Sequence, residues 1–386
     1  MPGPIPLGLF YAAIFIGAGA ASPYIPVWFH HRGLSGAEIG VILSAPMLAR
    51  VVTAPAVAIW ADSFKLRRTP IAVLGLVMAL AYGLMAPPGG IAWWFVVWFV
   101  ASTTYASLPP LTDVIVLQRA QSDGFNYGWP RGMGSLAFIV GNVCMGLILA
   151  RHSPELVLVW AGGAALATGL GAVLLLPRDP VASDGGHAST AERWTGLKDL
   201  LRDKDFMLVV GSAGLIQSAH AYYYGFSTLV WRAQGIADSM TGLLWGAGVA
   251  VEVAFLWFME PWRRRMGPRN LLVIGGVAGV VRWTALAFSP PLWLTFPIQA
   301  LHTLTYAATF TASLTLVERL AKPANASSAQ LINSALQGGI LSGVATLASG
   351  VLFDHFAAKG YLAMTAMTGL GLLGALRLYG VKRLDG

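Results

Sequence analysis

Seven ionisable side chains lie deep inside long apolar runs, and their chemistry is the first feature that needs an explanation. They are Arg50, Asp113, Arg131, His220, Glu252, Arg282 and His302. A charge at the centre of a bilayer costs at least about 2.5–3.5 kcal/mol on insertion scales, so each such side chain is expected to face a partner or a water-filled cavity. Carboxylates, guanidinium groups and imidazoles together are able to bind an organic ion or to carry a proton.

Four of these residues lie on four different apolar runs of the C-terminal half: Glu252, Arg282, His302 and His220. A guanidinium near a carboxylate favours its charged form, whereas removal from water favours the neutral form. An arginine that moves, or a substrate that arrives, would therefore load or discharge a proton on Glu252. We favour this proton-coupling role over a buried network that only holds helices together.

The N-terminal half holds a second pair, Asp113 and Arg131, close to the loop that joins their two runs. Their similar depth permits a salt bridge. Two readings stay open at this point: a bridge that holds the helices or acts as a gate, and a direct role in substrate binding.

A polar face interrupts the run "FMLVVGSAGLIQSAHAYYYGFSTLVW". Gln217, His220 and Tyr224 follow the spacing i, i+3, i+7, which places them on one side of a helix. We expect this face to line a central cavity. For the neighbouring Tyr222 and Tyr223 we expect, for at least one, simple packing with the hydroxyl on a backbone carbonyl.

Other polar and aromatic residues are predicted to line the same cavity. The candidates are Tyr24 and Trp28 in the first run, Trp245 in the eighth, and Asn333 and Gln337 in the eleventh. Asn333 and Gln337 share a helical face with Gln330, and they either line the cavity or link helices.

The elements that position these residues are about twelve apolar runs, each with the roughly 20 residues that a helix needs to cross a bilayer. Only 11% of the residues are charged, against about 25% in soluble domains. Most of the 25 Lys and Arg residues fall in alternate loops, which assigns those loops and both termini to the cytoplasm. The net charge of +8 therefore reflects topology and does not indicate a nucleic-acid partner.

The chain repeats itself. "GLSGAEIGVILSAPMLARV" and "GIADSMTGLLWGAGVAVEV" align without a gap and place Arg50 opposite Glu252. We predict an all-α membrane protein with twelve transmembrane helices in two pseudo-symmetric six-helix bundles, which is the major facilitator fold with its substrate site between the halves. The predicted domains are residues 1–176 and 205–386, joined by a cytoplasmic loop, 177–204. After the second helix of each half, a cytoplasmic gate is expected at Asp62, Arg67, Arg68 and Glu260.

The chain resembles the 3-phenylpropionic acid transporter family, which belongs to the lactose-permease-like, proton-linked branch of the major facilitator superfamily. The resemblance rests on "QSAHAYYYGF", "VAVEV", "GVVRW", "QALHTLTY", "LARVV", "PLTDV" and "YGWPRGMGSLAF". It implies coupling and binding roles for Glu252, Arg282 and His302, and sugar-type binding by Asp113 and Arg131.

Two departures from the family pattern stand out. Tyr306 replaces a carboxylate one turn after the histidine, so proton transfer would rest on Glu252 itself. Ala58 and Ser63 degrade the loop motif of the superfamily, which weakens the assignment of a gate there.

These observations predict a proton symporter, and not an enzyme, that carries a small aromatic acid inward with Arg50 facing its carboxylate. We expect no cofactor apart from the coupling proton, no metal, no nucleic acid, and a monomer in the inner membrane whose partners are its substrate and the lipid bilayer. The alternatives are a sugar or nucleoside symporter of the same fold, and an exporter. A membrane-embedded enzyme or sensor is disfavoured, because the sequence shows no metal-ligand cluster, nucleotide loop or nucleophile motif.

Overall fold

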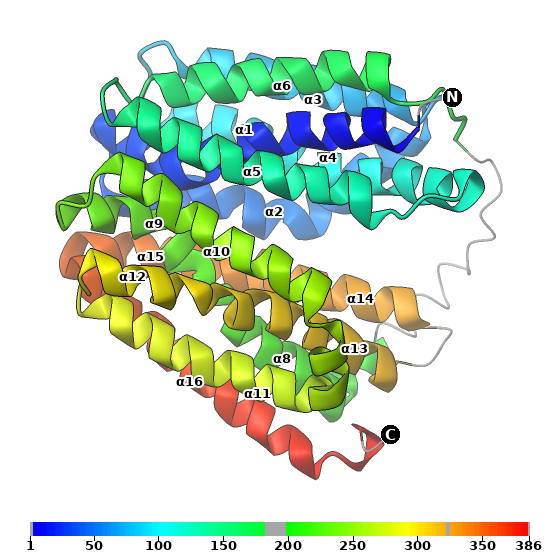
Figure 1. Ribbon diagram of the computed structural model, residues 1–386, viewed down its shortest axis with the longest axis vertical. Helices are drawn as coiled ribbons and strands as arrows, with labels where there is room; N and C mark the ends of the chain where they lie inside the picture. The colour runs from blue at the N-terminus through cyan, green and yellow to red at the C-terminus, as the bar shows by residue number, and fades with distance from the viewer. Residues whose placement is uncertain (1–2, 182–197, 322–324, 385–386) are drawn as a thin grey trace. The chain divides into compact units, whose positions relative to one another are not determined.

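The computed structural model describes residues 3–181, 198–321 and 325–384, and within these ranges the chain is helical (Figure 1). No strand occurs in the described part; one isolated β-bridge joins Leu66 to Pro180. The predicted all-α class is therefore confirmed. Most of the expected central loop, residues 182–197, lies outside the described residues.

Contacts between Cα atoms divide the chain into two compact units. Unit 1 comprises Met1–Ser183 and Ser227–Gly246, and unit 2 comprises Asp184–Phe226 and Ala247–Gly386. The predicted domain boundaries follow sequence halves instead and stay predictions.

Unit 1 is built on six long helices, which pack as α1 on α5 and α6, α3 on α4 and α6, and α2 on α4. Their bounds are α1 Pro4–His31, α2 Gly36–Asp62, α3 Arg68–Met85, α4 Ile91–Asp123, α5 Gly128–Leu149 and α6 Leu156–Leu175. Small residues allow close approach: a Cβ on Gly75 of α3 would lie 2.6 Å from the backbone nitrogen of Gly169 in α6. Such contacts are typical of helix pairs in membranes, where packing replaces the hydrophobic effect.

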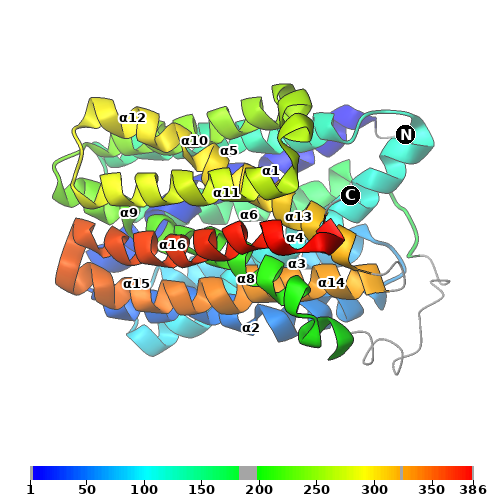
Figure 2. The same ribbon diagram turned by 90° about the horizontal axis from the view of Figure 1, so that it is seen from below.

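Most of the remaining helices are shorter. They are α8 Lys204–Ser218, α9 His220–Ala233, α10 Asp238–Phe258, α11 Glu260–Ala287, α12 Leu292–Ala300, α13 Thr309–Leu320, α14 Ala326–Ser334, α15 Ser342–Phe356 and α16 Tyr361–Arg377. In unit 2, α16 packs on α11 and α8, and Figure 2 shows α16 running along α11.

Irregular turns explain why the apolar runs do not all appear as single helices. The seventh run is broken at Ala219 into α8 and α9. The tenth contains a π-helical segment, η1 (Leu304–Ala308), and the eleventh contains another, η3 (Ala335–Leu341). Within the described residues, nine helical stretches are long and apolar enough to span a membrane; one of these, Ser328–Gly380, covers two of the predicted runs.

The internal repeat is visible in local geometry. Gly33 and Gly235 have φ angles of 89° and 78°, a left-handed conformation that glycine adopts without steric cost. Each glycine follows the end of one helix and precedes the start of the next by the same number of residues. The aligned sequences "GLSG" and "GIAD" thus make the same turn, which supports the alignment of Arg50 with Glu252.

Candidate functional site

Arg282, near the C-terminal end of α11, is a charge in unit 2 with several partners. Its side chain is completely buried. Nη1 donates to His302 Nδ1 and to Thr305 Oγ1, both at 3.1 Å, and Nη2 donates to Gln299 Oε1 at 3.1 Å. The guanidinium also lies 4.6 Å from the ring of Tyr223 and 4.5 Å from that of Trp283, so aromatic faces contribute to holding the charge.

His302 lies between Arg282 and Glu252. Because a guanidinium only donates, Nδ1 of His302 must accept the bond from Arg282, and the neutral ring then carries its proton on Nε2. That nitrogen lies 3.4 Å from Glu252 Oε2. The imidazole therefore connects the fixed cation on one side to the carboxylate on the other, without direct contact between the two charges.

His220 is held in the opposite tautomer. Its Nδ1 donates to the backbone oxygen of Gln217 at 2.8 Å, and its Nε2 lies 3.0 Å from Thr305 Oγ1. With its Nδ1 proton committed to a carbonyl, a neutral His220 can only accept at Nε2. The single hydroxyl proton of Thr305 has two acceptors at 3.0 Å, this nitrogen and the backbone carbonyl of His302, while the hydroxyl oxygen accepts from Arg282. The side chains of His220 and Arg282 thus meet through Thr305, the His302 ring joins them through Arg282, and Glu252 joins through His302.

The predicted polar face of the seventh run survives the helix break. The rings of His220 and Tyr224 stack at 5.7 Å, and Gln217 donates from Nε2 to the backbone oxygen of Tyr306 at 3.3 Å. Tyr222 donates its hydroxyl proton to the Ala357 carbonyl, as expected for at least one of the two neighbouring tyrosines.

Two backbone carbonyls inside π-helical segments are capped from the end of α8. Gln217 caps Tyr306, within η1, and Ser218 Oγ donates to the Gln337 carbonyl, within η3, at 3.1 Å. A π-helical turn disturbs the usual backbone bonding and often marks a functional site. Here the end of α8 supplies partners to both irregular turns.

Asn333 and Gln337 are buried in contacts that link helices. Gln337 Nε2 donates to Ser313 Oγ of α13 at 2.8 Å and to Asn333 Oδ1, and Ser313 Oγ donates to the same Asn333 oxygen at 3.1 Å. Of the two alternatives left open by the sequence, linking helices is the one that these bonds describe; a role in substrate binding stays a prediction.

In unit 1, Asp113 and Arg131 are held apart by aromatic residues. Asp113 Oδ1 accepts hydrogen bonds from the hydroxyl of Tyr11 and, at 2.9 Å, from that of Tyr127. The guanidinium of Arg131 lies over the rings of Phe15, at 4.4 Å, and Tyr11, at 5.6 Å. No ion pair joins Asp113 to Arg131 in the described structure, so the salt bridge that their depth permits is not formed.

Arg50, in α2, differs from the other two intramembrane arginines, Arg131 and Arg282, in its contacts. Among the residues that the structure describes, it has no hydrogen bond, ion pair or ring contact, and its side chain is partly exposed. It is therefore a partly exposed guanidinium in an apolar segment, and its role in substrate binding stays a prediction.

The predicted aromatic lining residues of unit 1 have contacts of their own. Tyr24 is buried and directs its hydroxyl at the Asn142 carbonyl, 3.4 Å away. Trp28 donates from Nε1 to Glu155 at 3.0 Å, and Trp245 Nε1 lies 3.3 Å from Thr228 Oγ1. These contacts place the three side chains within the packing of unit 1, and their contribution to a substrate site stays a prediction.

The four predicted gate residues belong to both units, three to unit 1 and Glu260 to unit 2. Arg68 donates to the backbone oxygen of Val173 at 2.7 Å and so caps the end of α6. Arg67 donates its backbone N–H to the carbonyl of Asp179 at 3.0 Å, while Glu260 pairs with Arg264 one turn along its own helix. Asp62 is exposed. A gating role remains a prediction for all four.

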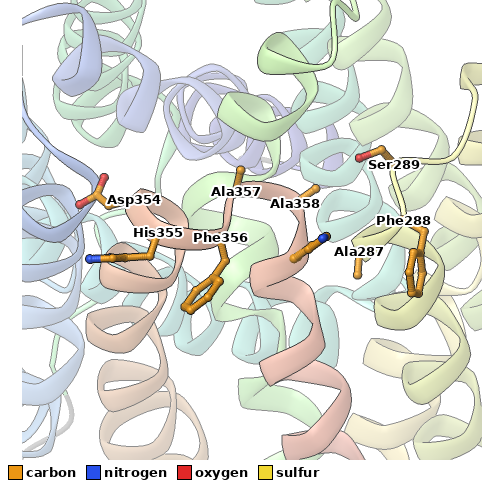
Figure 3. A pocket seen from close by; sticks show the side chains of 9 residues that line it. Ala287, Phe288, Ser289, Asp354, His355, Phe356, Ala357 and Ala358 are labelled. Carbon is orange, nitrogen blue, oxygen red and sulfur yellow. The ribbon is translucent and has the colours of Figure 1, made fainter.

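An open pocket of about 650 Å³ lies elsewhere in unit 2, at the turns that follow α11 and α15 (Figure 3). Figure 3 shows Asp354 and His355 on one side and Phe288 and Ser289 on the other. Their side chains do not converge on one point, and none of the predicted site residues lines this pocket. The described residues also contain no group of three or more His, Cys, Asp or Glu side chains able to hold a metal ion.

Several residues of these clusters were not predicted from the sequence. Gln299, Thr305 and Tyr223 all contact the guanidinium of Arg282. One signal was available for Gln299, because it is a polar residue three positions before His302 and therefore on the same face of that helix.

Known protein families settle the class of this chain. The model of the MFS_1-like family matches residues 5–363. The chain belongs to the MFS_1-like family. It is thus a multi-pass membrane transporter of the major facilitator type and not an enzyme, and the predicted twelve-helix fold is confirmed.

Individual relatives agree on this class and differ in what they carry. The chain is 28% identical to a "probable 3-phenylpropionic acid transporter" of Escherichia coli strain K12, over 90% of this chain and 91% of that protein. It is 29% identical to a maltose permease of Geobacillus stearothermophilus, over 98% and 95%. A crystal structure of a mutant of the nucleoside transporter NupG shares the fold, with a TM-score of 0.83 at 18% identity, covering 98% of this chain and 99% of that one.

Proposed function

We propose that this transporter is a proton symporter for a small aromatic carboxylic acid. The observation that carries the substrate class is Arg50, a guanidinium within an apolar helix that has no partner among the described residues. Leaving it unpaired in the membrane would cost at least about 2.5–3.5 kcal/mol. The carboxylate of a substrate neutralises this charge and accepts two parallel N–H bonds from its planar fork.

Proton coupling is proposed for the cluster of Glu252, His302 and Arg282. Glu252 is the one carboxylate in the cluster, and it faces the Nε2 side of an imidazole whose other nitrogen accepts from Arg282. An ionised carboxylate in a low-dielectric site is costly, and a proton on Glu252 removes this cost. In this scheme Glu252 takes up the proton before the carrier changes conformation and releases it on the other side.

The similarity to the E. coli protein supports an aromatic acid, because that relative is described as a probable 3-phenylpropionic acid transporter. A second candidate is a neutral sugar, which the similar identity to a maltose permease favours. In that case Asp113 and Arg131 would bind sugar hydroxyls and Arg50 would not be needed for affinity. Inward transport follows from the direction of the proton gradient, which also allows export when the gradients are reversed.

The test is uptake of labelled 3-phenylpropionate into proteoliposomes that contain the purified full chain, with and without an acid-outside gradient. We expect accumulation that disappears when the gradient is collapsed. Arg50→Gln should lose affinity, whereas Arg151→Gln, an exposed arginine in a loop, is the matched control and should behave as wild type. Uptake of maltose but not of the acid would favour the second candidate.

A further inference from the structure

Gln299 is a completely buried amide beside Arg282. Its Oε1 accepts from Arg282 Nη2 at 3.1 Å, and its Nε2 donates to the Tyr223 hydroxyl at 2.7 Å. The orientation of the amide is fixed by chemistry, because a guanidinium can only donate and therefore requires the carbonyl oxygen.

This amide supplies the acceptor for Nη2 of Arg282, whereas the buried Nε–H has no hydrogen-bond partner in the described structure. Nη1 is already directed at His302 and Thr305, and the rings of Tyr223 and Trp283 lie 4.6 Å and 4.5 Å from the guanidinium. With Nη2 held by Gln299, the planar guanidinium cannot turn about its own axis without breaking a hydrogen bond. Tyr223 contributes twice, through its ring and through its bond with Gln299.

The orientation of Arg282 determines its distance from Glu252. In the described structure no ion pair of 4.0 Å or less joins these two charges, and the neutral imidazole of His302 lies between them. Among the described residues, Glu252 is the one carboxylate that contacts this cluster, so it is the opposite charge that Arg282 would approach if Nη2 lost its acceptor and the guanidinium reoriented. A direct pair would hold Glu252 in its charged form and make it harder to protonate.

We propose that Gln299 is a positioning residue that keeps Arg282 directed at His302 and away from Glu252, so that Glu252 remains able to take up a proton. This inference rests on the proposed coupling role of Glu252. The other titratable groups that surround the pair are His220, Tyr223 and Tyr224 of α9, His302 and Tyr306 of the tenth run, and Tyr361 of α16.

Two substitutions of similar size separate positioning from simple packing. Gln299→Met keeps the length of the side chain but removes the acceptor, and should move the pH dependence of uptake to lower pH by about one unit, a tenfold higher proton concentration. Gln299→Glu keeps an acceptor on Nη2 and should not produce this acid shift. Tyr223→Phe, which removes only the partner of the amide N–H, should produce a smaller shift in the same direction.

The experiment measures two quantities on the purified full chain. The first is the initial rate of 3-phenylpropionate uptake as a function of external pH. The second needs no substrate: it is the pH titration of a carboxyl band in difference infrared spectra, identified as Glu252 by its loss in Glu252→Gln. We expect both midpoints to fall in Gln299→Met and not in Gln299→Glu. Equal midpoints in wild type and Gln299→Met would overturn the proposal.

The outcomes also separate this inference from the proposed function. If wild type does not transport 3-phenylpropionate, the substrate assignment fails, and the infrared midpoints alone decide the role of Gln299. If no carboxyl band disappears in Glu252→Gln, both proposals are wrong. If Gln299→Met does not fold, Tyr223→Phe decides: a lower midpoint supports the positioning role, and an unchanged midpoint contradicts it.

Discussion

Arg50 and Glu252 occupy equivalent positions in the two repeats, yet their surroundings differ. Arg50 has no partner within the described residues of unit 1. Glu252 faces His302 at 3.4 Å, and His302 in turn accepts from the buried Arg282. The same turn, marked by Gly33 and Gly235, introduces both helices. One repeat thus has a charge with no partner among the described residues, and the other embeds its charge in a network.

A similar contrast separates the two arginine–carboxylate pairs on adjacent spans. In unit 1, Asp113 and Arg131 are each satisfied by different aromatic residues. In unit 2, Arg282 and Glu252 share a single imidazole. A proton that arrives at Glu252 therefore changes the field on His302 and Arg282 directly, whereas a change at Asp113 is first felt by two tyrosines. Position in the repeat does not decide function; the partners of each charge do.

Replacement of Glu252 should have the largest effect. A pH gradient of two units stores about 2.7 kcal/mol per proton and can support about 100-fold accumulation in wild type. Glu252→Gln cannot release a proton, so accumulation in proteoliposomes should fall to equilibration while exchange of labelled for unlabelled substrate continues. Full proton-driven accumulation by this variant would remove Glu252 from the coupling scheme.

Replacement of Arg50 should affect binding rather than coupling. Loss of a charged hydrogen-bond partner costs about 1.5–3 kcal/mol, which corresponds to an increase of roughly tenfold to 100-fold in KM for the acid. Arg50→Lys keeps the charge without the planar fork and should fall between wild type and Arg50→Gln. An unchanged KM in Arg50→Gln would place the carboxylate site elsewhere.

A packing variant should show the opposite pattern, with lower stability and intact coupling. An alanine at Gly75 places its Cβ 2.6 Å from the backbone nitrogen of Gly169, and overpacking of this kind costs about 1–3 kcal/mol. The midpoint of thermal unfolding in detergent should fall. Gly163→Ala, on the same helix as Gly169 and with no atom within 4 Å of the added carbon, is the control and should not lower the midpoint.

A double-mutant cycle tests whether aromatic residues, and not Arg131, hold Asp113. Tyr11→Phe combined with Asp113→Asn should give a coupling energy of about 1 kcal/mol, the value for a typical hydrogen bond. Arg131→Gln combined with Asp113→Asn should give a value near zero in unfolding experiments. A larger coupling energy for Arg131 with Asp113 than for Tyr11 with Asp113 would mean that Arg131 and Asp113 form an ion pair in solution.

The smallest effect is expected at the C-terminal end of unit 2. Burial alone would raise the pKa of the Asp203 carboxyl, but its hydrogen bonds with Arg383 and with the backbone N–H of Phe206 and Asp205 outweigh burial and lower that pKa. A lowered folded-state pKa means stability that is present above the unfolded value, about 3.9, and that is lost as the pH falls through the folded value.

Arg383→Gln should therefore destabilise the chain by about 0.2–1 kcal/mol at neutral pH, because the pair is partly exposed and screened by solvent. The difference from wild type in thermal midpoint should shrink below about pH 4 and at high salt. A difference that persists at low pH would mean that Arg383 acts through its bond to the Leu320 carbonyl instead.

Much of the fold follows from the sequence because apolar length and the Lys/Arg distribution are strong, local signals. The grouping of Glu252, Arg282, His302 and His220 was also accessible, since a buried charge requires a partner. The contacts that each residue makes inside this group could not be predicted from the sequence. Whether His302 bridges Arg282 and Glu252 or only lies beside them depends on the orientation of its ring, which contacts Arg282, Glu252 and the stacked ring of Tyr306.

The missed features share one physical origin. The break at Ala219 and the two π-helical segments result from tertiary contacts. The residue at the break is an alanine, and not a glycine or proline from which a break could be predicted. The absence of an Asp113–Arg131 bridge has the same basis: Tyr11 and Phe15 come from α1, far away in sequence, and provide hydroxyl and ring contacts that the spacing of the two charges does not reveal.

The end of α8 has a mechanical consequence. Gln217 hydrogen-bonds the irregular turn of the tenth run, and Ser218 hydrogen-bonds that of the eleventh. His220, the first residue of α9, hydrogen-bonds Thr305. The seventh, tenth and eleventh spans are therefore linked at this point. None of them can bend there without straining its hydrogen bonds to the others. The helix break in the seventh run therefore couples the three spans, so that a tilt of one span is transmitted to its neighbours.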